Sequence, residues 1–302
     1  MQETTYHIPA LLSETIEGLD IRPGGIYVDA TLGGGGHSRA IVERLSSDGH
    51  LYSFDQDIDA IQHAFSDPRL TVVHGNFRYL TNFLRYYGVS EVDGILADLG
   101  VSFHHFDDPD RGFSFRWEGR LDMRMNRKSA VDATQILAGY TVDQLAEMFH
   151  LLGELKNARK IAQAIVARRD AEPVTTVEQL RAVIAPYINP RQEKKELAQV
   201  FQALRIEVNR ELDVLKAFLA QSLTALRPGG RLAIITYHSL EDRLVKNFMK
   251  TGNIEGRQEK DFFGKSLSPL KLITSKPLTA SDREVEANPR SRSAKLRIAE
   301  KI

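Results

Sequence analysis

The stretch that decides the fold is Ile26–Ser38, which reads IYVDATLGGGGHS. Its first three residues are apolar β-formers, typical of a buried parallel strand, and Asp29 ends that strand. Four consecutive glycines follow, and His37 and Ser38 then begin a segment whose apolar residues recur with helical spacing. A strand, a glycine turn and a helix in this order are how α/β proteins bring backbone close to a nucleotide-like ligand.

Two common nucleotide-binding motifs are absent, the first from this stretch and the second from residues 259–266. A dinucleotide fingerprint needs glycine at i, i+2 and i+5, but the last place falls on Ser38 or Arg39. A P-loop also fails, because Glu259 stands where the first glycine before Gly264-Lys265-Ser266 should be. The stretch therefore predicts a nucleotide-like ligand other than NAD or a P-loop nucleotide.

The acidic residues around the glycines indicate which ligand that is. Asp29 would repel a pyrophosphate but attract a ligand that carries an ammonium and a sulfonium. Asp55 ends the next strand-like run, at about the spacing from the glycines at which a carboxylate binds a ribose diol. The pair favours S-adenosylmethionine over NAD. The alternative is a glycine turn that binds nothing, with both aspartates as helix caps.

Composition excludes several classes of protein. The 302 residues are 42% hydrophobic and 26% charged, which is ordinary for a globular chain of one large domain or two smaller ones. There is no signal-peptide pattern and no apolar run of the ~18 residues that span a membrane. The absence of cysteine excludes disulfides and thiolate metal sites. We expect a cytoplasmic protein with no membrane association.

The net charge is zero, so the distribution of charge is more informative than its sum. Residues 156–169 contain five basic residues and no acidic one. Residues 111–128 contain six basic residues, interleaved with Phe113, Phe115 and Trp117. Alternating basic and aromatic residues suit single-stranded RNA. A solvated helix face with ordinary core aromatics explains the same pattern equally well.

Strands and helices alternate through the first hundred residues, with strands expected at 26–29, 51–55, 70–73 and 92–96. This rhythm predicts a doubly wound parallel sheet whose ligand lies at the carboxyl ends of the strands, where Asp29, Asp55 and Asp98 fall. From residue 104 to about 208 the pattern is helical, with capping boxes beginning at Thr141 and Thr176. The domains expected are thus 1–103 with 209–302, and an inserted helical domain at 104–208.

The sheet pattern resumes after the helical stretch. A turn at 227–230 precedes a strand at 231–237, and Ser239 is the expected cap of the helix that follows. Segments 267–274 and 294–302 are expected to be a hairpin-like pair of strands that closes the sheet. The polar segment between them, 276–293, is either an RNA-contacting loop or a surface excursion.

Seven sequence blocks, taken together, are typical of one protein family. They are TLGGGGHS (31–38), DLGVS (98–102), RGFSF (111–115), LDMRM (121–125), FQALRIEVNREL (201–212), HSLEDR (238–243) and NPRSRSAKLRIAEK (288–301). With these blocks the chain resembles the bacterial ribosomal RNA small-subunit methyltransferase H family, which methylates the N4 amine of cytidine in 16S rRNA. The resemblance runs essentially end to end and includes the inserted domain.

The resemblance implies a Rossmann-like class I S-adenosylmethionine-dependent methyltransferase with an inserted all-helical substrate-recognition domain. It implies a specific cytidine near the decoding centre of the small ribosomal subunit as the methyl acceptor. It also implies that the cofactor is bound by Gly34, Gly35, Gly36, His37, Asp55, Phe77, Asp98 and His105. His105 stands where the family usually has Gln, Phe103 where it has Ser, and Tyr237 where it commonly has Phe.

Asp98 is the catalytic candidate, since it ends a strand where amino-methyltransferases place hydrogen-bond acceptors for the amine. Phe103, Phe113, Phe115 and Tyr237 are candidates to cradle an unstacked base, and core packing is the alternative for each. His238 is either a base or RNA contact, or a structural histidine. No metal is expected, because His104 and His105 have no further ligand at suitable spacing.

Three functions remain open from sequence. The first is methylation of 16S rRNA cytidine, and the second is the same chemistry on another RNA, DNA or protein amine. The third is a nucleic-acid-binding protein that uses the fold without turnover. The sequence pattern leaves the oligomeric state undecided, as it does the choice between free rRNA and the assembled small subunit.

Overall fold

The computed structural model describes residues 9–101, 106, 108–264 and 266–302. The chain divides into two compact units. Residues 1–100 and 212–302 form the first, the sheet unit, and residues 101–211 form the second, the helical unit.

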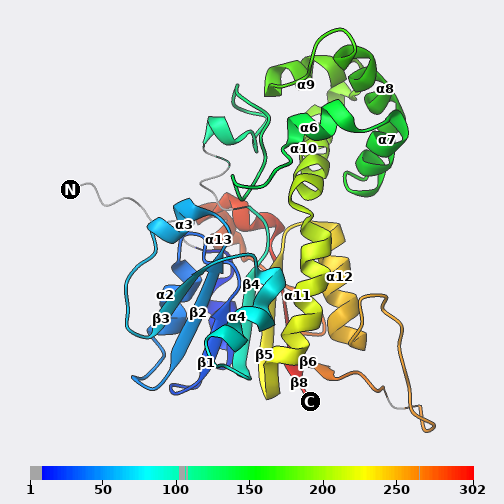
Figure 1. The fold of residues 1–302 in the computed structure, drawn as a ribbon. Coiled ribbons are helices and arrows are strands. Elements are labelled where there is room, and N and C mark those ends of the chain that lie inside the picture. Colours follow the sequence, from blue (N-terminus) through cyan, green and yellow to red (C-terminus); the bar gives the residue numbers. More distant parts are fainter. Residues whose placement is uncertain (1–8, 102–105, 107, 265) are drawn as a thin grey trace. The chain divides into compact units, whose positions relative to one another are not determined.

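The sheet unit is built on one eight-stranded sheet, with the order β3-β2-β1-β4-β5-β8-β6 and with β7 also paired to β8 (Figure 1). The first five strands pair in parallel, whereas β8 is antiparallel to all its neighbours. The predicted doubly wound parallel sheet is therefore confirmed. The strands are β1 (Ile26–Asp29), β2 (His50–Asp55), β3 (Leu70–His74), β4 (Val92–Asp98), β5 (Leu226–Thr236), β6 (Leu270–Leu272), β7 (Leu278–Thr279) and β8 (Lys295–Lys301).

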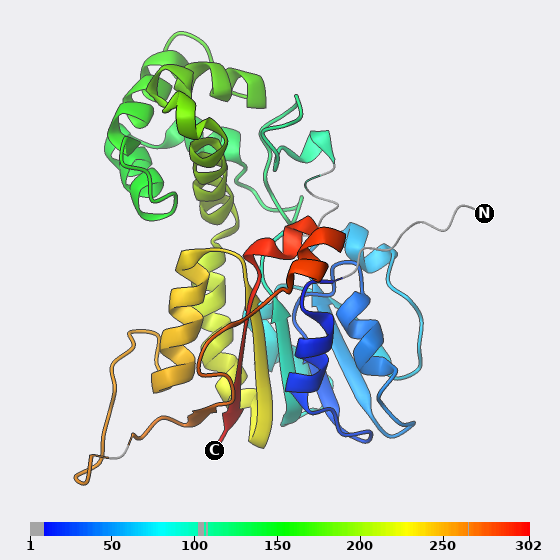
Figure 2. The ribbon, with the colours of Figure 1, turned by 180° about the vertical axis from the view of Figure 1, so that it is seen from behind.

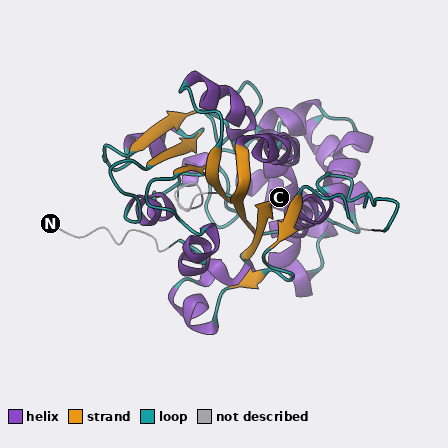
Figure 3. Ribbon diagram, turned by 90° about the horizontal axis from the view of Figure 1, so that it is seen from below, coloured by secondary structure: helices purple, strands orange, loops and turns teal. Residues whose placement is uncertain are grey.

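Helices cover both faces of this sheet, as the view along the strands shows (Figure 3). Strand residues alternate between the two faces, so Tyr27 packs with α1 and α2, whereas Val28 packs with α4, α11 and α12. Figure 2 shows the face that α1 and α2 cover. The helices are α1 (Leu12–Leu19), α2 (Gly36–Val42), α3 (Ile58–Gln62), α4 (Leu80–Tyr86), α11 (Glu211–Ala225), α12 (Ser239–Thr251) and α13 (Asp282–Ala287), with 3-10 turns η1 (Phe77–Tyr79) and η5 (Pro289–Ser293).

The register of the parallel strands brings the acidic strand ends to one edge. Asp29 lies opposite Ser53 of β2 and Leu96 of β4, so Asp55 and Asp98 each lie two residues beyond its level. Because parallel strands all end in the same direction, these three aspartates share the carboxyl edge of the sheet.

The carboxyl-terminal part differs in detail from the expectation. The paired strands that close the sheet are confirmed as β6 and β8. Strand β5 begins at Leu226 and so includes the segment expected as a turn, because Val92 of β4 pairs with Leu226 before a register shift. Segment 276–293 is not one loop, since it contains β7, α13 and η5.

The helical unit contains no strand among its described residues, apart from an isolated bridge between Arg120 and Thr176. Both predicted capping boxes are confirmed: the Thr141 hydroxyl accepts the Gln144 N–H, and Thr176 and Gln179 are arranged likewise. A third box joins Asp132 and Gln135. The helices are α6 (Ala133–Gly139), α7 (Val142–Leu151), α8 (Ala158–Arg169), α9 (Val177–Ile184) and α10 (Glu193–Asn209), with 3-10 turns η2 (Pro109–Arg111), η3 (Ala185–Tyr187) and η4 (Pro190–Gln192).

Part of the basic and aromatic segment 111–128 serves this unit's own packing. Arg111 is 1% exposed, and its guanidinium donates to the carbonyls of Arg124 and Met125. Phe113 is buried in the same core, and the Phe115 ring packs edge-on against Phe201. These contacts favour the core-packing interpretation of the two aromatics.

In the part of the chain that the structure describes, no helix combines the length and the apolar character needed to cross a membrane.

The Gly112 position yields a test of how this unit is held together. Its φ is +69°, and a Cβ there would collide with the Arg120 carbonyl oxygen and lie 2.9 Å from the Asp122 nitrogen. We expect Gly112→Ala to lower the free energy of unfolding by about 2–4 kcal/mol, from left-handed strain plus overpacking. Urea unfolding followed by the fluorescence of Trp117, the only tryptophan, measures it.

Gly139→Ala is the matched control, because Gly139 ends α6 with open space where a Cβ would lie. That change should be neutral or stabilising by up to about 1 kcal/mol. Equal urea midpoints for the two variants would contradict this account of Gly112.

Candidate active site

The carboxylate of Asp29 is the centre of the hydrogen-bond network at the carboxyl edge of the sheet. It is fully buried, and its Oδ1 accepts the Thr31 N–H at 3.0 Å and the Thr31 hydroxyl at 3.3 Å. Its Oδ2 accepts the Ser38 hydroxyl at 2.6 Å, and that hydroxyl lies 2.8 Å from the Ser53 hydroxyl. One carboxylate thus ties the end of β1 to the turn, to α2 and, through Ser38, to β2.

Thr31 extends this network to β4. Its hydroxyl oxygen accepts the Asp98 N–H at 2.7 Å while its own hydrogen is directed to Asp29. The Leu99 N–H donates to the Ile235 carbonyl of β5, so the backbone on both sides of the Asp98 side chain is fixed. Asp98 therefore projects from a rigid strand end.

The glycine loop leaves its backbone open. Gly33 and Gly35 have φ values of +49° and +76°, a conformation that suits glycine because it has no Cβ. A Cβ at Gly34 would meet no atom within 4 Å, and that residue is exposed. Gly36, by contrast, packs against Pro9. Gly33 and Gly34 thus present bare backbone to a ligand.

Asp55 joins this loop to the end of β2. Its Oδ2 accepts the Gly33 N–H and its Oδ1 accepts the Asp57 N–H, both at 2.9 Å. A carboxylate offers about four acceptor positions. The carboxylate therefore fixes the glycine loop at the carboxyl end of β2, and its binding of a ribose stays a prediction.

Phe77 begins the 3-10 turn after β3, next to Asn76, whose side chain caps that turn. Its ring is half-buried and meets Phe218 of α11 edge-on, with 5.0 Å between ring centroids. The anchored ring keeps part of its surface exposed, as stacking against an adenine requires.

His37 lies in the first turn of α2 and is 5% exposed. Burial lowers its pKa to about 4, against a smaller opposing effect from the Ala10 backbone. The imidazole is therefore neutral at pH 7, and its Nδ1 lies 3.7 Å from Oδ2 of Asp98, which is too long for a hydrogen bond.

Asp98 has the most unusual electrostatic setting of these residues. Burial, together with the charges of Asp29 and Glu241, raises its pKa to about 7, and a hydrogen bond from Tyr237 opposes that rise. The Tyr237 hydroxyl donates to Oδ1 at 2.9 Å. The side chain is nevertheless 22% exposed, so a substrate can reach it.

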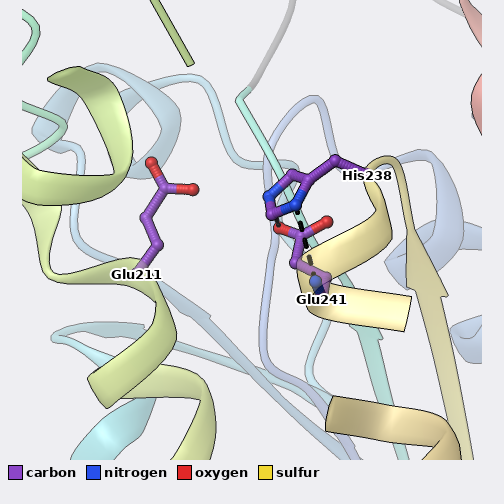
Figure 4. Close-up of side chains that lie close together, drawn as sticks. All are labelled: Glu211, His238 and Glu241. Atoms are coloured by element: carbon purple, nitrogen blue, oxygen red, sulfur yellow. Dashed lines mark hydrogen bonds and ion pairs between the residues drawn. The ribbon is translucent and has the colours of Figure 1, made fainter. Parts of the chain in front are cut away.

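His238 caps helix α12 (Figure 4). Its Nδ1 accepts the Glu241 N–H at 3.4 Å, and its Nε2 lies 3.1 Å from the Glu241 carboxylate. The prediction that Ser239 is the cap is wrong, because the helix already begins at Ser239 and the His238 imidazole before it accepts the N–H of the third helical residue, Glu241. The structural interpretation of His238 is therefore favoured.

The structure brings the predicted glycines, His37, Asp55, Phe77 and Asp98 to one edge of the sheet unit. His105 and Phe103, two residues that differ from those usual in the family, lie outside the described residues. Phe113 and Phe115 belong to the core of the helical unit. The role of each of these residues in binding stays a prediction.

Sequence reasoning missed three polar contributors. Thr31, Ser38 and Ser53 connect the aspartates, yet single hydroxyl residues near strand ends carry no signal of their own. Tyr237 was expected only as a cradle for the base. Its place just after β5, next to β4 in the sheet, was the available sign that its hydroxyl reaches Asp98.

These groups fit S-adenosylmethionine. The carboxylates of Asp29 and Asp98 suit its ammonium and sulfonium charges, and Asp55 suits its ribose. The open backbone at Gly33 and Gly34 leaves room for the ligand to approach. The fold is that of a Rossmann-like class I S-adenosylmethionine-dependent methyltransferase, because strands β1–β5 are parallel and β8 is antiparallel between β5 and β6. The site at the carboxyl edge of this sheet agrees with that class. The predicted fold class is confirmed.

Comparison with known proteins agrees, since residues 4–302 match the model of the MraW methylase family. The chain belongs to this family. It is therefore a methyltransferase, and its methyl donor is S-adenosylmethionine.

Two relatives have the name ribosomal RNA small subunit methyltransferase H. The protein from Phocaeicola vulgatus is 60% identical over 296 residues, which cover 98% of this chain and 97% of that protein. The protein from Parabacteroides distasonis is 60% identical over 302 residues, covering 100% and 99%. Among solved structures, an rRNA methylase from Streptococcus thermophilus aligns with a TM-score of 0.41 at 13% identity, covering 98% of this chain and 99% of that one.

The raised pKa of Asp98 predicts how stability depends on pH. Its pKa is about 7 in the folded chain against an ordinary 3.8, so the folded state binds more protons between these values. Stability contributed by protonated Asp98 is present below about pH 4 and lost as pH rises through about 7. Asp29, whose pKa is raised to about 6, likewise makes the fold less stable as pH rises. His37, whose pKa is lowered, makes the fold more stable as pH rises.

Comparison with Asp98→Asn isolates this group. We expect wild-type stability, relative to the variant, to fall by on the order of 3 kcal/mol between pH 5 and pH 8. Urea unfolding at the two pH values measures it. A difference that does not change with pH would contradict the assigned pKa.

Proposed function

We propose that this methyltransferase acts on the N4 amine of a specific cytidine in 16S rRNA, near the decoding centre of the small ribosomal subunit, in the cytoplasm. The observation that carries the proposal is the Asp98 carboxylate, which stands accessible at the end of β4 beside the glycine loop. The names of the relatives, at 60% identity over the whole chain, support ribosomal RNA as the substrate class.

Cytosine N4 is a poor nucleophile, because its lone pair is delocalised into the ring. An enzyme must hold the amine in line with the methyl group and accept hydrogen bonds from its N–H groups. S-adenosylmethionine supplies an electrophilic methyl group on a sulfonium. The amine forms the new N–C bond, the electron pair of the broken C–S bond returns to sulfur, and one amine proton leaves.

Asp98 is suited to receive that proton. Its Oδ1 is occupied by the Tyr237 hydroxyl, and its Oδ2 lies 3.7 Å from Nδ1 of the neutral His37 ring. A pKa of about 7 places the carboxyl near the pH at which a general base works best. A cationic donor nearby would lower that pKa and favour the charged form.

We propose that the helical unit contributes phosphate contacts to RNA binding. Lys156 and Lys160 are exposed at the beginning of α8, where no acidic residue interrupts the run, whereas Arg159 between them pairs with Asp143 at 2.9 Å. Arg169, at the other end of that helix, donates to the carbonyls of Leu137 and Tyr140 and is structural. The available positive charge is therefore at the beginning of the helix.

The proposal is tested on small subunits from cells that lack this modification. With labelled S-adenosylmethionine, wild-type protein should place label in N4-methylcytidine after digestion to nucleosides. Asp55→Ala should weaken donor binding at least tenfold, because it loses the ribose acceptor and releases the Gly33 loop. Asp48→Ala, in the exposed turn before the same strand, is the matched control and should leave activity unchanged.

Asp98→Asn tests the chemical step. It preserves shape but removes the proton acceptor, so turnover at saturating donor should fall by about 10²–10³-fold, far more than donor affinity falls from the loss of one carboxylate charge. Unchanged turnover would remove Asp98 from the mechanism. Label in another nucleoside, or in protein, would show methyl transfer to a different substrate. Donor binding without transfer of any label would contradict the proposed acceptor.

A further inference from the structure

The Tyr237 side chain is held in one position at the carboxyl edge of the sheet. It directly follows β5, and its N–H donates to Oε2 of Glu241 at 3.0 Å. Its ring lies against Gly100, where a Cβ would come within 3.2 Å of the ring carbon Cδ2. Gly100 has a φ of +120°, a conformation that other residues rarely adopt. The backbone and the ring of Tyr237 are thus both held in place independently of the hydrogen bond that its hydroxyl makes.

That partner is the Asp98 carboxylate, whose Oδ1 accepts the hydroxyl at 2.9 Å. The other oxygen, Oδ2, lies 3.7 Å from Nδ1 of His37. The hydroxyl therefore fixes one oxygen and leaves the second without a hydrogen bond from the described residues. A bound amine would find its acceptor already oriented.

We propose that Tyr237 is a positioning residue for methyl transfer, holding Asp98 in the orientation and the charge state in which Oδ2 accepts the amine proton. This inference rests on the proposed role of Asp98. Tyr237 itself exchanges no proton with the substrate, because burial and the charge of Asp98 raise the pKa of its hydroxyl further above the ordinary value of 10.

Charged and titratable groups approach Asp98 from three neighbouring elements. Asp29, at the end of β1, and Glu241, in α12, are acidic and disfavour a negative charge on Asp98. His37 of α2 is neutral and gives no compensating positive charge. Tyr237 is the group among these that stabilises the charged carboxylate, since its hydroxyl donates to it.

Tyr237→Phe is the test, because it keeps the ring against Gly100 and removes only the hydroxyl. Without that donor the pKa of Asp98 should rise by about one unit, so the rising limb of the kcat profile should move up by about one pH unit. At pH 7 the deprotonated fraction of Asp98 should fall from about one half to about one tenth, so kcat should fall by about fivefold and recover above about pH 9, with the KM for both substrates nearly unchanged.

Tyr27→Phe is the matched control. Tyr27 is also a buried tyrosine of the same sheet, but its hydroxyl accepts the Arg22 N–H and lies far from Asp98 in the strand register. Its loss should lower stability without moving the pH profile. A uniform loss of kcat in Tyr237→Phe at every pH, or an unchanged profile, would overturn the inference.

A second readout does not need turnover. Carbon-13 NMR of aspartate side chains in the unliganded protein, with Asp98 assigned from Asp98→Asn, measures the Asp98 pKa directly. An upward shift of about one unit in Tyr237→Phe is expected, even if the substrate proves to be a different amine. If the Asp98 pKa does not shift in Tyr237→Phe, the inference is overturned while the proposed function stands. If the pKa shifts but Asp98→Asn keeps normal turnover, the proposed function fails and the inference fails with it.

Discussion

The buried carboxylate of Asp29 is the interaction on which the carboxyl edge of this sheet depends. It ends β1 out of contact with water and is satisfied by the backbone and hydroxyl of Thr31 and by the hydroxyl of Ser38. Burying a charge is unfavourable unless such partners are present. Because Thr31 in turn accepts the Asp98 N–H, the same carboxylate positions both the glycine turn and the end of β4.

This arrangement concentrates acidic groups where a cation is to bind. Burial raises the pKa of Asp29 to about 6 and that of Asp98 to about 7, so the unliganded edge is electrostatically strained. A ligand with a sulfonium and an ammonium would relieve that strain, whereas a pyrophosphate would increase it. The residues that suit methyl transfer are thus also those that make the edge less stable as pH rises, the usual relation between function and stability.

Much of the fold followed from local pattern, because the strands β1–β4 are short apolar runs that alternate with helical segments, and β1, β2 and β4 end in an aspartate. The site followed from spacing, since parallel strands bring Asp29, Asp55 and Asp98 to one edge. What could not be predicted depends on tertiary contacts. The cap of α12 is His238 rather than Ser239, and the hydroxyl of Tyr237 reaches Asp98 across neighbouring strands. Neither follows from propensity.

In the proposed mechanism the amine to be methylated meets Asp98 while the donor ribose meets Asp55. A crystal structure of this chain with S-adenosylhomocysteine and cytidine is the most direct test. We expect N4 of the base within about 3 Å of Oδ2 of Asp98, and the ribose hydroxyls at similar distance from Asp55. A base bound with N4 remote from Asp98, or a donor bound away from the glycine loop, would contradict this mechanism.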